Sequence, residues 1–202
     1  MRNEIIQHNF TSYKPESIFT TYLDKEDTRT NIIDEIKKSG DKQDYKTNVK
    51  AYMTDWNMAD KPGFQELNKH IIDTCHYLNS LYYRKTVGLQ VSNLWGMMYK
   101  KGDYAIVHDH WPALWSGVYY IKAPKNSGHL KIDDPRSSAA MCRPNQKDGE
   151  KPIRLLRETH YKPIAGRCIM FPSWLMHCVD PNESNDIRIS VSFNFLQKGM
   201  FV

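Results

Sequence analysis

Three histidines are the residues of this sequence most suited to chemistry. His108 and His110 occur in the segment HDHW, and His177 occurs in FPSWLMHCVDP. Residues i and i+2 of an extended strand face the same side, so His108 and His110 present two imidazoles toward one point while Asp109 faces away. Three neutral imidazoles that leave open positions suit a catalytic iron or another first-row metal. The pattern predicts a metal centre with His177 as the third ligand, although an HxH pair alone also fits two histidines that bind no metal.

Short strands are the elements expected to position these histidines. β-branched and aromatic runs, separated by Gly, Pro, Asn and Asp, fill the second half of the chain. They read VGLQVSNLWGMMY, SGVYYIKAP, GHLKID, GRCIMFP and IRISVSFNFL. Strand–helix alternation is missing, which argues against a parallel doubly wound sheet and favours a sandwich or small barrel. The fold class predicted is mainly β with flanking helices (α+β).

The first half of the chain predicts helical support for this β core. A helix is expected from Pro62 to about Tyr83, because apolar residues recur there at helical spacing. These residues are Phe64, Leu67, Ile71, Cys75, Leu78 and Leu81. A shorter helix is expected over Asn31–Lys38. We therefore predict one domain over residues 1–202, with helical support in 1–85 and the β core in 86–202.

Composition narrows the class of protein further. The chain has 202 residues with 40% hydrophobic content, enough for one core without disulfides. Its cysteines form no CxxC pair, the start MRNEIIQHNF lacks the apolar stretch of a signal peptide, and no 18 apolar residues run together. The 28 basic residues are interleaved with 23 acidic ones, which disfavours a nucleic-acid partner. We expect a cytoplasmic protein without a membrane segment.

Several ordered motifs between residues 95 and 195 carry a family resemblance. Y-x-x-G-x-Y, H-x-H, SGVYYI and SGHLKI follow one another from Tyr99, and YKPIAGRCIMFPSWLMHCVDP is followed by RISVSFN. Together they resemble the prolyl-hydroxylase type of 2-oxoglutarate oxygenases. The Asp-Pro-Arg at 134–136 and FPSWLxH further resemble a family of 2-oxoglutarate and iron oxygenases found in bacteria and phages. The resemblance implies a double-stranded β-helix (jelly-roll or cupin-like) that uses Fe(II), 2-oxoglutarate and O2.

The resemblance also implies roles for residues beyond the histidines. Arg188, eleven residues after His177, matches the Arg that binds the distal carboxylate of 2-oxoglutarate, and its planar fork suits a carboxylate. Ser190 lies two residues along the same strand and therefore on the same face. Tyr120 matches the position that donates a hydrogen bond to that carboxylate, and Leu130 matches an apolar residue that packs against the cosubstrate chain. Tyr99 and Tyr104 are expected to approach its keto-acid end. For each tyrosine, core packing is the competing interpretation.

One ligand position departs from the wider superfamily. Most members place Asp or Glu two residues after the first His, whereas this chain has His110. If all three histidines bind, a neutral ligand replaces an anion. The open alternatives are that Asp134, at the end of GHLKIDD, or Asp109, after a local bulge, supplies a carboxylate.

The resemblance implies decarboxylation of 2-oxoglutarate to succinate, coupled to hydroxylation of a substrate. A peptide prolyl group, a free amino acid and another small molecule are the open alternatives for that substrate. Rim residues expected around the substrate are Trp56, Trp111, Trp115, Arg136 and the polar loop 137–152, which we expect to act as a lid, whereas Trp174 is expected in the core. Two other classes stay open: a cupin-type metal dioxygenase that does not use 2-oxoglutarate, and a non-catalytic small-molecule-binding barrel. The cupin-type enzyme would not need Arg188 or the Arg-x-Ser spacing, and the binding barrel would tolerate loss of the metal.

Overall fold

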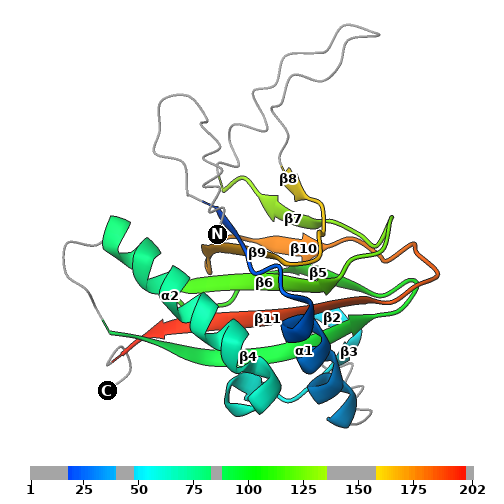
Figure 1. Cartoon of the computed structure of the whole chain (residues 1–202). Coiled ribbons are helices and arrows are strands. Elements are labelled where there is room, and N and C mark those ends of the chain that lie inside the picture. The colour runs from blue at the N-terminus through cyan, green and yellow to red at the C-terminus, as the bar shows by residue number, and fades with distance from the viewer. Residues whose placement is uncertain (1–17, 40–47, 83–87, 136–157, 199–202) are drawn as a thin grey trace, which may run out of the picture.

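Two antiparallel sheets form the body of the computed structural model, which describes residues 18–39, 48–82, 88–135 and 158–198 (Figure 1). The six-stranded sheet has the order β1 (Phe19–Tyr22), β9 (Arg167–Pro172), β6 (Trp115–Lys122), β11 (Arg188–Gln197), β4 (Leu89–Tyr99), β3 (Tyr52–Met53). The five-stranded sheet has the order β2 (Val49–Lys50), β5 (Tyr104–His108), β10 (His177–Val179), β7 (Leu130–Asp133), β8 (Glu158–Tyr161). This is the expected double-stranded β-helix, and all five strand-like runs of the sequence form strands.

Helices cover the outer face of the six-stranded sheet. In Figure 1, α1 (Glu26–Lys38) and α2 (Gln65–Tyr82) lie in front of β4, β6 and β11. Two short 3-10 turns, η1 (Met58–Asp60) and η2 (Pro62–Phe64), lead into α2. The expected helix near Pro62 is therefore confirmed, but Leu81 in its last turn is 53% exposed, so the buried stripe ends at Leu78. The N-terminal part also adds β1, β2 and β3 to the sheets, which the sequence pattern did not predict.

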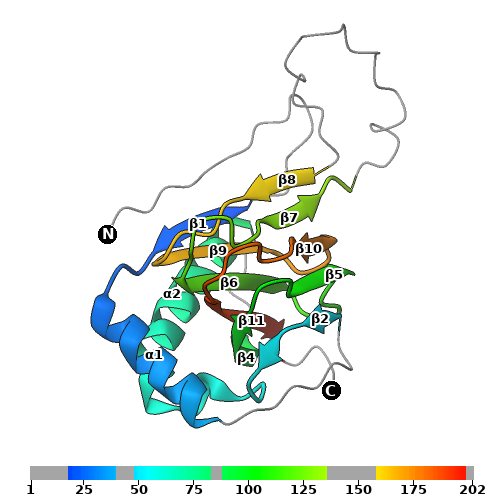
Figure 2. The same ribbon diagram turned by 90° about the vertical axis from the view of Figure 1, so that its right-hand side faces the viewer.

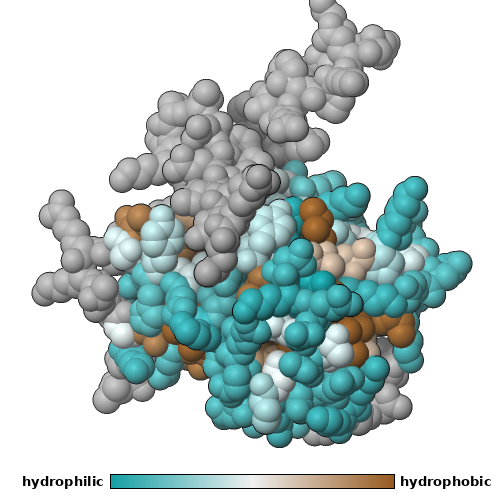
Figure 3. Space-filling model, viewed as in Figure 1, coloured by the Kyte–Doolittle hydropathy of each residue, from teal (hydrophilic) through white to brown (hydrophobic). Residues whose placement is uncertain are grey.

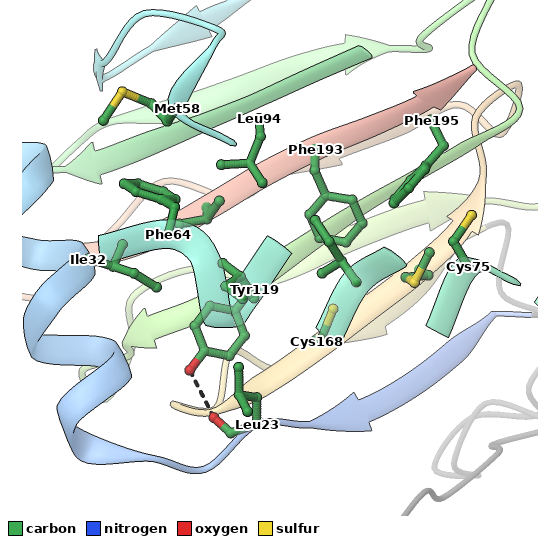
Figure 4. Close-up of a cluster of buried hydrophobic side chains, with 14 of the residues drawn as sticks. Leu23, Ile32, Met58, Phe64, Cys75, Leu94, Tyr119, Cys168, Phe193 and Phe195 are labelled. Carbon is green, nitrogen blue, oxygen red and sulfur yellow. Dashed lines mark hydrogen bonds between the residues drawn. The ribbon is translucent and has the colours of Figure 1, made fainter. Parts of the chain in front are cut away.

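The main core lies between these helices and the six-stranded sheet (Figure 4). Ile32 of α1 and Phe64 are fully buried against the sheet residues Leu94 and Phe193. Tyr119 points to this outer side, where its hydroxyl donates to the Leu23 carbonyl oxygen at 2.9 Å. Burial of this apolar surface stabilises the sheet and fixes which residues of β6 face the barrel interior.

Hydrophilic side chains dominate the described surface on the helix side (Figure 3). The acidic residues Glu26 and Asp27 in the first turn of α1, and Lys37 and Lys38 in its last turn, complement the helix dipole. Among the described helices, none is both long and apolar enough to cross a membrane.

Candidate functional site

Strand pairing brings two of the histidines together across the five-stranded sheet. Figure 2 shows β10 between β5 and β7, and in this arrangement His177 lies directly opposite His108. The next pair along the two strands joins Val179 to Ala105, so β5 holds one residue more than β10 between the pairs. Such a bulge turns a side chain relative to the regular alternation. It allows Ala105 and His108, three residues apart, both to line the same interior pocket.

His110 joins the pair from the segment that follows β5. Its backbone N–H donates to the Ser173 carbonyl oxygen at 3.0 Å, and the Ser173 N–H donates to the Leu114 carbonyl oxygen at 3.2 Å. These bonds tie the segment to the turn that precedes His177. The ring centroid of His110 lies 4.9 Å from that of His108 and 5.0 Å from that of His177. One potential ligand atom from each of the three rings lies within 4.8 Å of the others.

Hydrogen bonds to backbone carbonyls fix the protonation of two rings. His108 Nδ1 lies 2.7 Å from the Ile106 oxygen, and His177 Nδ1 lies 2.8 Å from the Leu175 oxygen. A carbonyl oxygen can only accept, so Nδ1 carries the hydrogen in both rings. The lone pair is therefore on Nε2, the atom left to bind a metal, an arrangement common in metal-ligating histidines.

Burial keeps the three rings neutral. Desolvation, with a smaller contribution from the neighbouring His108, lowers the pKa of His177 to about 3 and that of His110 to about 4. The pKa of His108 is also lowered, again by burial first. Phe171 packs edge-on against His177 with a centroid distance of 4.7 Å. Neutral imidazole is the form that binds metal, so the site keeps its ligands ready well below neutral pH.

The two alternative carboxylates lie apart from this group. Asp109 is exposed, and its carboxylate is 3.4 Å from the backbone nitrogen of Trp111. Asp134 follows the end of β7. Within the described part of the chain, the metal-ligating side chains that converge here are the three histidines alone.

An interior pocket extends from the histidines into the barrel. Its empty space amounts to about 560 Å³, a figure that includes open solvent at its mouth. Its lining combines the three histidines with residues from both sheets: Val49, Trp95, Met97, Tyr99, Ala105, Gly117, Val118, Tyr120, Leu130, Phe171, Val179, Arg188, Ser190 and Ser192. The predicted cosubstrate residues therefore share one pocket with the predicted ligands. Sequence reasoning missed Trp95 and Met97, whose alternation along β4 was the available signal.

Arg188 places a buried positive charge in this pocket. The residue is 1% exposed, and its guanidinium carbon lies 3.9 Å from the centre of the Tyr99 ring. Nη1 donates to the carbonyl oxygens of Ser127 and Gly128, the latter at 3.2 Å, while Nε has no hydrogen-bond partner. No ion pair joins Arg188 to a carboxylate among the residues that the structure describes. A buried cation of this kind is costly without an anion.

The other predicted cosubstrate residues surround Arg188. Ser190 pairs with Tyr120 across β11 and β6, and Arg188 pairs with Tyr99 across β11 and β4. Burial raises the pKa of Tyr99 to about 12 and also raises that of Tyr120, so both phenols keep their protons as hydrogen-bond donors. Tyr104 was expected near the keto-acid end, but it is 37% exposed and absent from the pocket lining, because it lies on the outward side of β5.

The expected aromatic rim is only partly present. Trp115 was placed there by sequence, but it is buried and packs edge-on against Phe19. Trp174 was expected in the core, yet it is half-exposed, because it lies in the tight turn after β9. Trp56 and Trp111 are exposed as expected, and the Trp56 ring lies 6.3 Å from the pocket residue Trp95. Arg136 and the expected lid 137–152 fall outside the described residues.

The model of the family described as "Putative 2OG-Fe(II) oxygenase" matches residues 93–194 of the 202. No curated protein sequence matches the chain.

Solved structures share the fold at low identity. A prolyl-4-hydroxylase from Pseudomonas putida aligns with a TM-score of 0.65 and 16% identity over 91% of this chain and 94% of that one. The viral collagen prolyl hydroxylase of Paramecium Bursaria Chlorella virus-1, in a 2-oxoglutarate complex, aligns with a TM-score of 0.60 and 16% identity over 88% and 94%. HygX from Streptomyces hygroscopicus, with nickel and 2-oxoglutarate bound, aligns with a TM-score of 0.64 and 11% identity over 91% and 84%.

Proposed function

We propose, because this chain belongs to the 2OG-Fe(II) oxygenase family, that His108, His110 and His177 hold its iron and that Arg188 anchors 2-oxoglutarate. The enzyme is an Fe(II)- and 2-oxoglutarate-dependent oxygenase that couples the decarboxylation of 2-oxoglutarate to succinate with hydroxylation of a substrate. The proposal concerns which side chains of this chain perform the binding. These four residues come from three strands, β5, β10 and β11, and from the segment that follows β5.

One observation carries the proposal: the buried Arg188, which has no carboxylate partner among the described residues, shares a pocket with three neutral imidazoles. A guanidinium pairs bidentately with a carboxylate, and 2-oxoglutarate carries one at each end. The pocket thus offers a cation for the distal carboxylate and a metal site for the keto-acid end. The residues present fit both groups.

Fe(II), when bound, supplies the activation of O2 that couples loss of CO2 from 2-oxoglutarate to attack on a C–H bond. The chain itself contributes position and environment. The carbonyls of Ile106 and Leu175 hold the His108 and His177 rings with Nε2 directed away from them. Phe171, Trp95 and Met97 line the pocket with apolar surface, which limits water near the reacting atoms.

Cosubstrate recognition is proposed to combine charge and hydroxyl groups. Arg188 contributes the charge, while Ser190 and Tyr120, a cross-strand pair, offer hydroxyls on the same interior face. Leu130 and Val118 line the apolar wall beside them. Since three histidines leave the metal with its full positive charge, a dianionic cosubstrate is attracted at least as strongly as in a site with a carboxylate ligand.

The metal assignment is tested by titrating Mn(II), an oxygen-stable stand-in for Fe(II), into the purified metal-free protein. Alanine at His108, His110 or His177 is expected to abolish stoichiometric binding. Asp109→Asn and Asp134→Asn are matched controls and are expected to bind like the wild type. Full metal affinity in the His110→Ala variant, together with a loss in either aspartate variant, contradicts the three-histidine assignment.

The anchor assignment is tested by 2-oxoglutarate binding to metal-loaded protein. Arg188→Met is expected to leave metal affinity nearly intact and to weaken cosubstrate affinity by about 2 to 4 kcal/mol, the scale of a lost charge-assisted contact. Arg29→Met changes an arginine of helix α1 that pairs with Asp24 outside the pocket and serves as the control. Equal cosubstrate affinity in Arg188→Met and wild type removes the support for this anchor and favours a cupin-type metal dioxygenase.

Substrate class and compartment belong to the same proposal. Prolyl hydroxylases are among the similar folds, and HygX has been solved with hygromycin B, so a peptide prolyl group and a small molecule are both candidates for hydroxylation. The three cysteines that the structure describes are free thiols, which supports a reducing, cytoplasmic location. Assay of succinate release against peptide and amino-acid panels tests the substrate.

A further inference from the structure

A second arginine lies buried in the barrel, away from the metal ligands. Arg167 is the first residue of β9 and is 8% exposed. Alternate residues of β9 divide between the two faces: Cys168 packs in the core under the helices, while Ile169 and Phe171 pack in the interior cluster. By this alternation the Arg167 side chain points into the barrel, on the same face as Ile169 and Phe171.

The unpaired atoms of Arg167 form a defined binding edge. Nε and Nη2 are both buried without a hydrogen-bond partner. These two nitrogens lie on the same side of the planar guanidinium and point two parallel N–H groups at one region, which is the geometry that matches the two oxygens of a carboxylate. Leaving this edge empty in a buried position is costly.

No described side chain neutralises this arginine. Ion pairs among the described residues do not include Arg167. The carboxylate of Asp24, which lies near the adjacent Gly166, is engaged by Arg29 of helix α1. Neutralising the charge of Arg167 therefore requires an anion other than the described side chains.

The neighbours of Arg167 are suited to an anion. The hydroxyl oxygen of Thr20 is also buried without a hydrogen-bond partner, and Thr20 pairs with Ile169, one alternate residue further along β9. Tyr120 and Tyr161 lie in the interior cluster with Ile169 and Phe171, on the face to which Arg167 points. Burial raises the pKa of both phenols, and the charge of Arg167 opposes the rise. Hydroxyls that keep their protons add donors to the arginine edge.

This region is separate from the pocket that holds Arg188. Tyr120 lines that pocket, whereas Arg167 does not. The charges of Arg188 and Arg167 both act to lower the pKa of Tyr120, against the larger effect of burial. The backbone N–H of Gly166 donates to the Tyr120 carbonyl oxygen at 2.8 Å, which fixes Arg167 beside Tyr120. A single dicarboxylate that reaches the metal site and Arg188 has no free carboxylate left for Arg167.

We propose that the Nε and Nη2 edge of Arg167 is a second anion site of the barrel and binds a small monocarboxylate, independently of the metal and of Arg188. Its occupant offsets the buried charge beside Tyr120 and thereby stabilises the cosubstrate wall of the barrel. The site goes beyond the oxygenase activity and does not depend on it.

Formate is the probe for this site, because it is the smallest carboxylate. The metal-free full chain is titrated with sodium formate, with sodium chloride at equal ionic strength as reference, and binding is followed by the melting temperature and by the side-chain 15Nε–1H NMR signals of the arginines. We expect a saturable rise in melting temperature above the chloride reference and a shift of one buried arginine signal that persists in Arg188→Met. That signal is absent from Arg167→Lys.

Variants separate the two arginines. In an Arg188→Met background, where formate cannot occupy the cosubstrate anchor, Arg167→Met is expected to lose the formate response. Arg167→Lys, which keeps the charge but not the two-donor edge, is expected to lose at least about tenfold in formate affinity in the same background. Arg188→Met is expected to keep formate affinity within about twofold. If Arg167→Met does not fold, the formate affinity of Arg167→Lys is the measurement that decides whether Arg167 binds the anion.

Two results overturn the proposal. One is a wild type in which formate stabilises no more than chloride and shifts no arginine signal. The other is a formate response that disappears in Arg188→Met while Arg167→Lys retains it, which assigns the anion to the cosubstrate pocket. Neither result bears on metal binding by the histidines, so the failure of this site and the failure of the oxygenase assignment are distinguishable.

Discussion

Acid is expected to destabilise the metal-free protein through its buried histidines. The unfolded chain has histidines with the ordinary pKa of 6.5, whereas in the folded protein the pKa is about 3 for His177 and about 4 for His110. Below pH 6.5 the unfolded state therefore binds protons that the folded state does not bind. The free energy of unfolding falls from there until the pH passes the folded-state values.

The size of this effect follows from the two shifts. At pH 5, each of the two histidines lowers the free energy of unfolding by roughly 2 kcal/mol relative to pH 8, so that the pair removes about 4 kcal/mol. His108, whose pKa is also lowered, acts in the same direction. Small proteins have a total stability of about 5 to 15 kcal/mol, so the loss is large enough to measure.

Urea unfolding at pH 8 and pH 5, followed by tryptophan fluorescence, measures this loss. His177→Gln removes one buried ring and is expected to reduce the difference between the two pH values by about 2 kcal/mol. His76→Gln changes an exposed histidine of α2 and is expected to leave the difference unchanged. If His177→Gln and wild type lose the same free energy between pH 8 and pH 5, the reasoning from burial is refuted.

Three further outcomes follow from the geometry. Gly128 has φ +86°, and an added Cβ would lie 2.2 Å from the Asp180 carbonyl oxygen and 3.0 Å from Arg188 Nη1. Because the added methyl group would displace Arg188, Gly128→Ala is expected to weaken 2-oxoglutarate affinity at least about tenfold in a direct titration. Gly117→Ala would place a Cβ 2.3 Å from Phe193 Cζ and is expected to destabilise the fold by roughly 1 to 3 kcal/mol in urea unfolding. Trp111 is 80% exposed, so Trp111→Ser is expected to change stability by less than about 0.5 kcal/mol. The Gly128 contact is contradicted by a wild-type cosubstrate affinity in Gly128→Ala, and the Gly117 contact by an unchanged urea midpoint in Gly117→Ala. A clear loss of stability in Trp111→Ser contradicts the expectation drawn from the exposure of Trp111.

Local patterns in the sequence were sufficient for the five long strand-like runs and for the approach of His108 to His110. Alternation over IRISVSFNFL places Arg188 and Ser190 on one face, and the structure puts both in the pocket lining. The HxH spacing predicted that His108 and His110 converge, and their rings lie 4.9 Å apart. These features depend on near neighbours in the chain. The single-domain extent over 1–202 stays a prediction.

Features that depend on distant pairing were not predictable in this way. Trp115 is buried because it faces Pro172 across the sheet and packs on Phe19 of β1, a strand that gave no clear signal. His110 lies beyond the end of β5, held by Ser173, and the bulge in β5 is set by its register with β10. The unpaired Nε and Nη2 edge of Arg167 likewise depends on the tertiary placement of the side chains around it.

The central claim is that each chain holds one Fe(II) and one 2-oxoglutarate in a site built from three histidines and Arg188. Titration of 2-oxoglutarate into anaerobic Fe(II)-loaded protein, followed by the visible metal-to-ligand absorption band, tests it most directly. We expect a band that saturates at one equivalent per chain and is absent in His177→Ala. In Arg188→Met we expect the band to require at least about 30-fold more 2-oxoglutarate, the equivalent of about 2 kcal/mol. A wild type that binds Fe(II) but shows no band at saturating 2-oxoglutarate contradicts it.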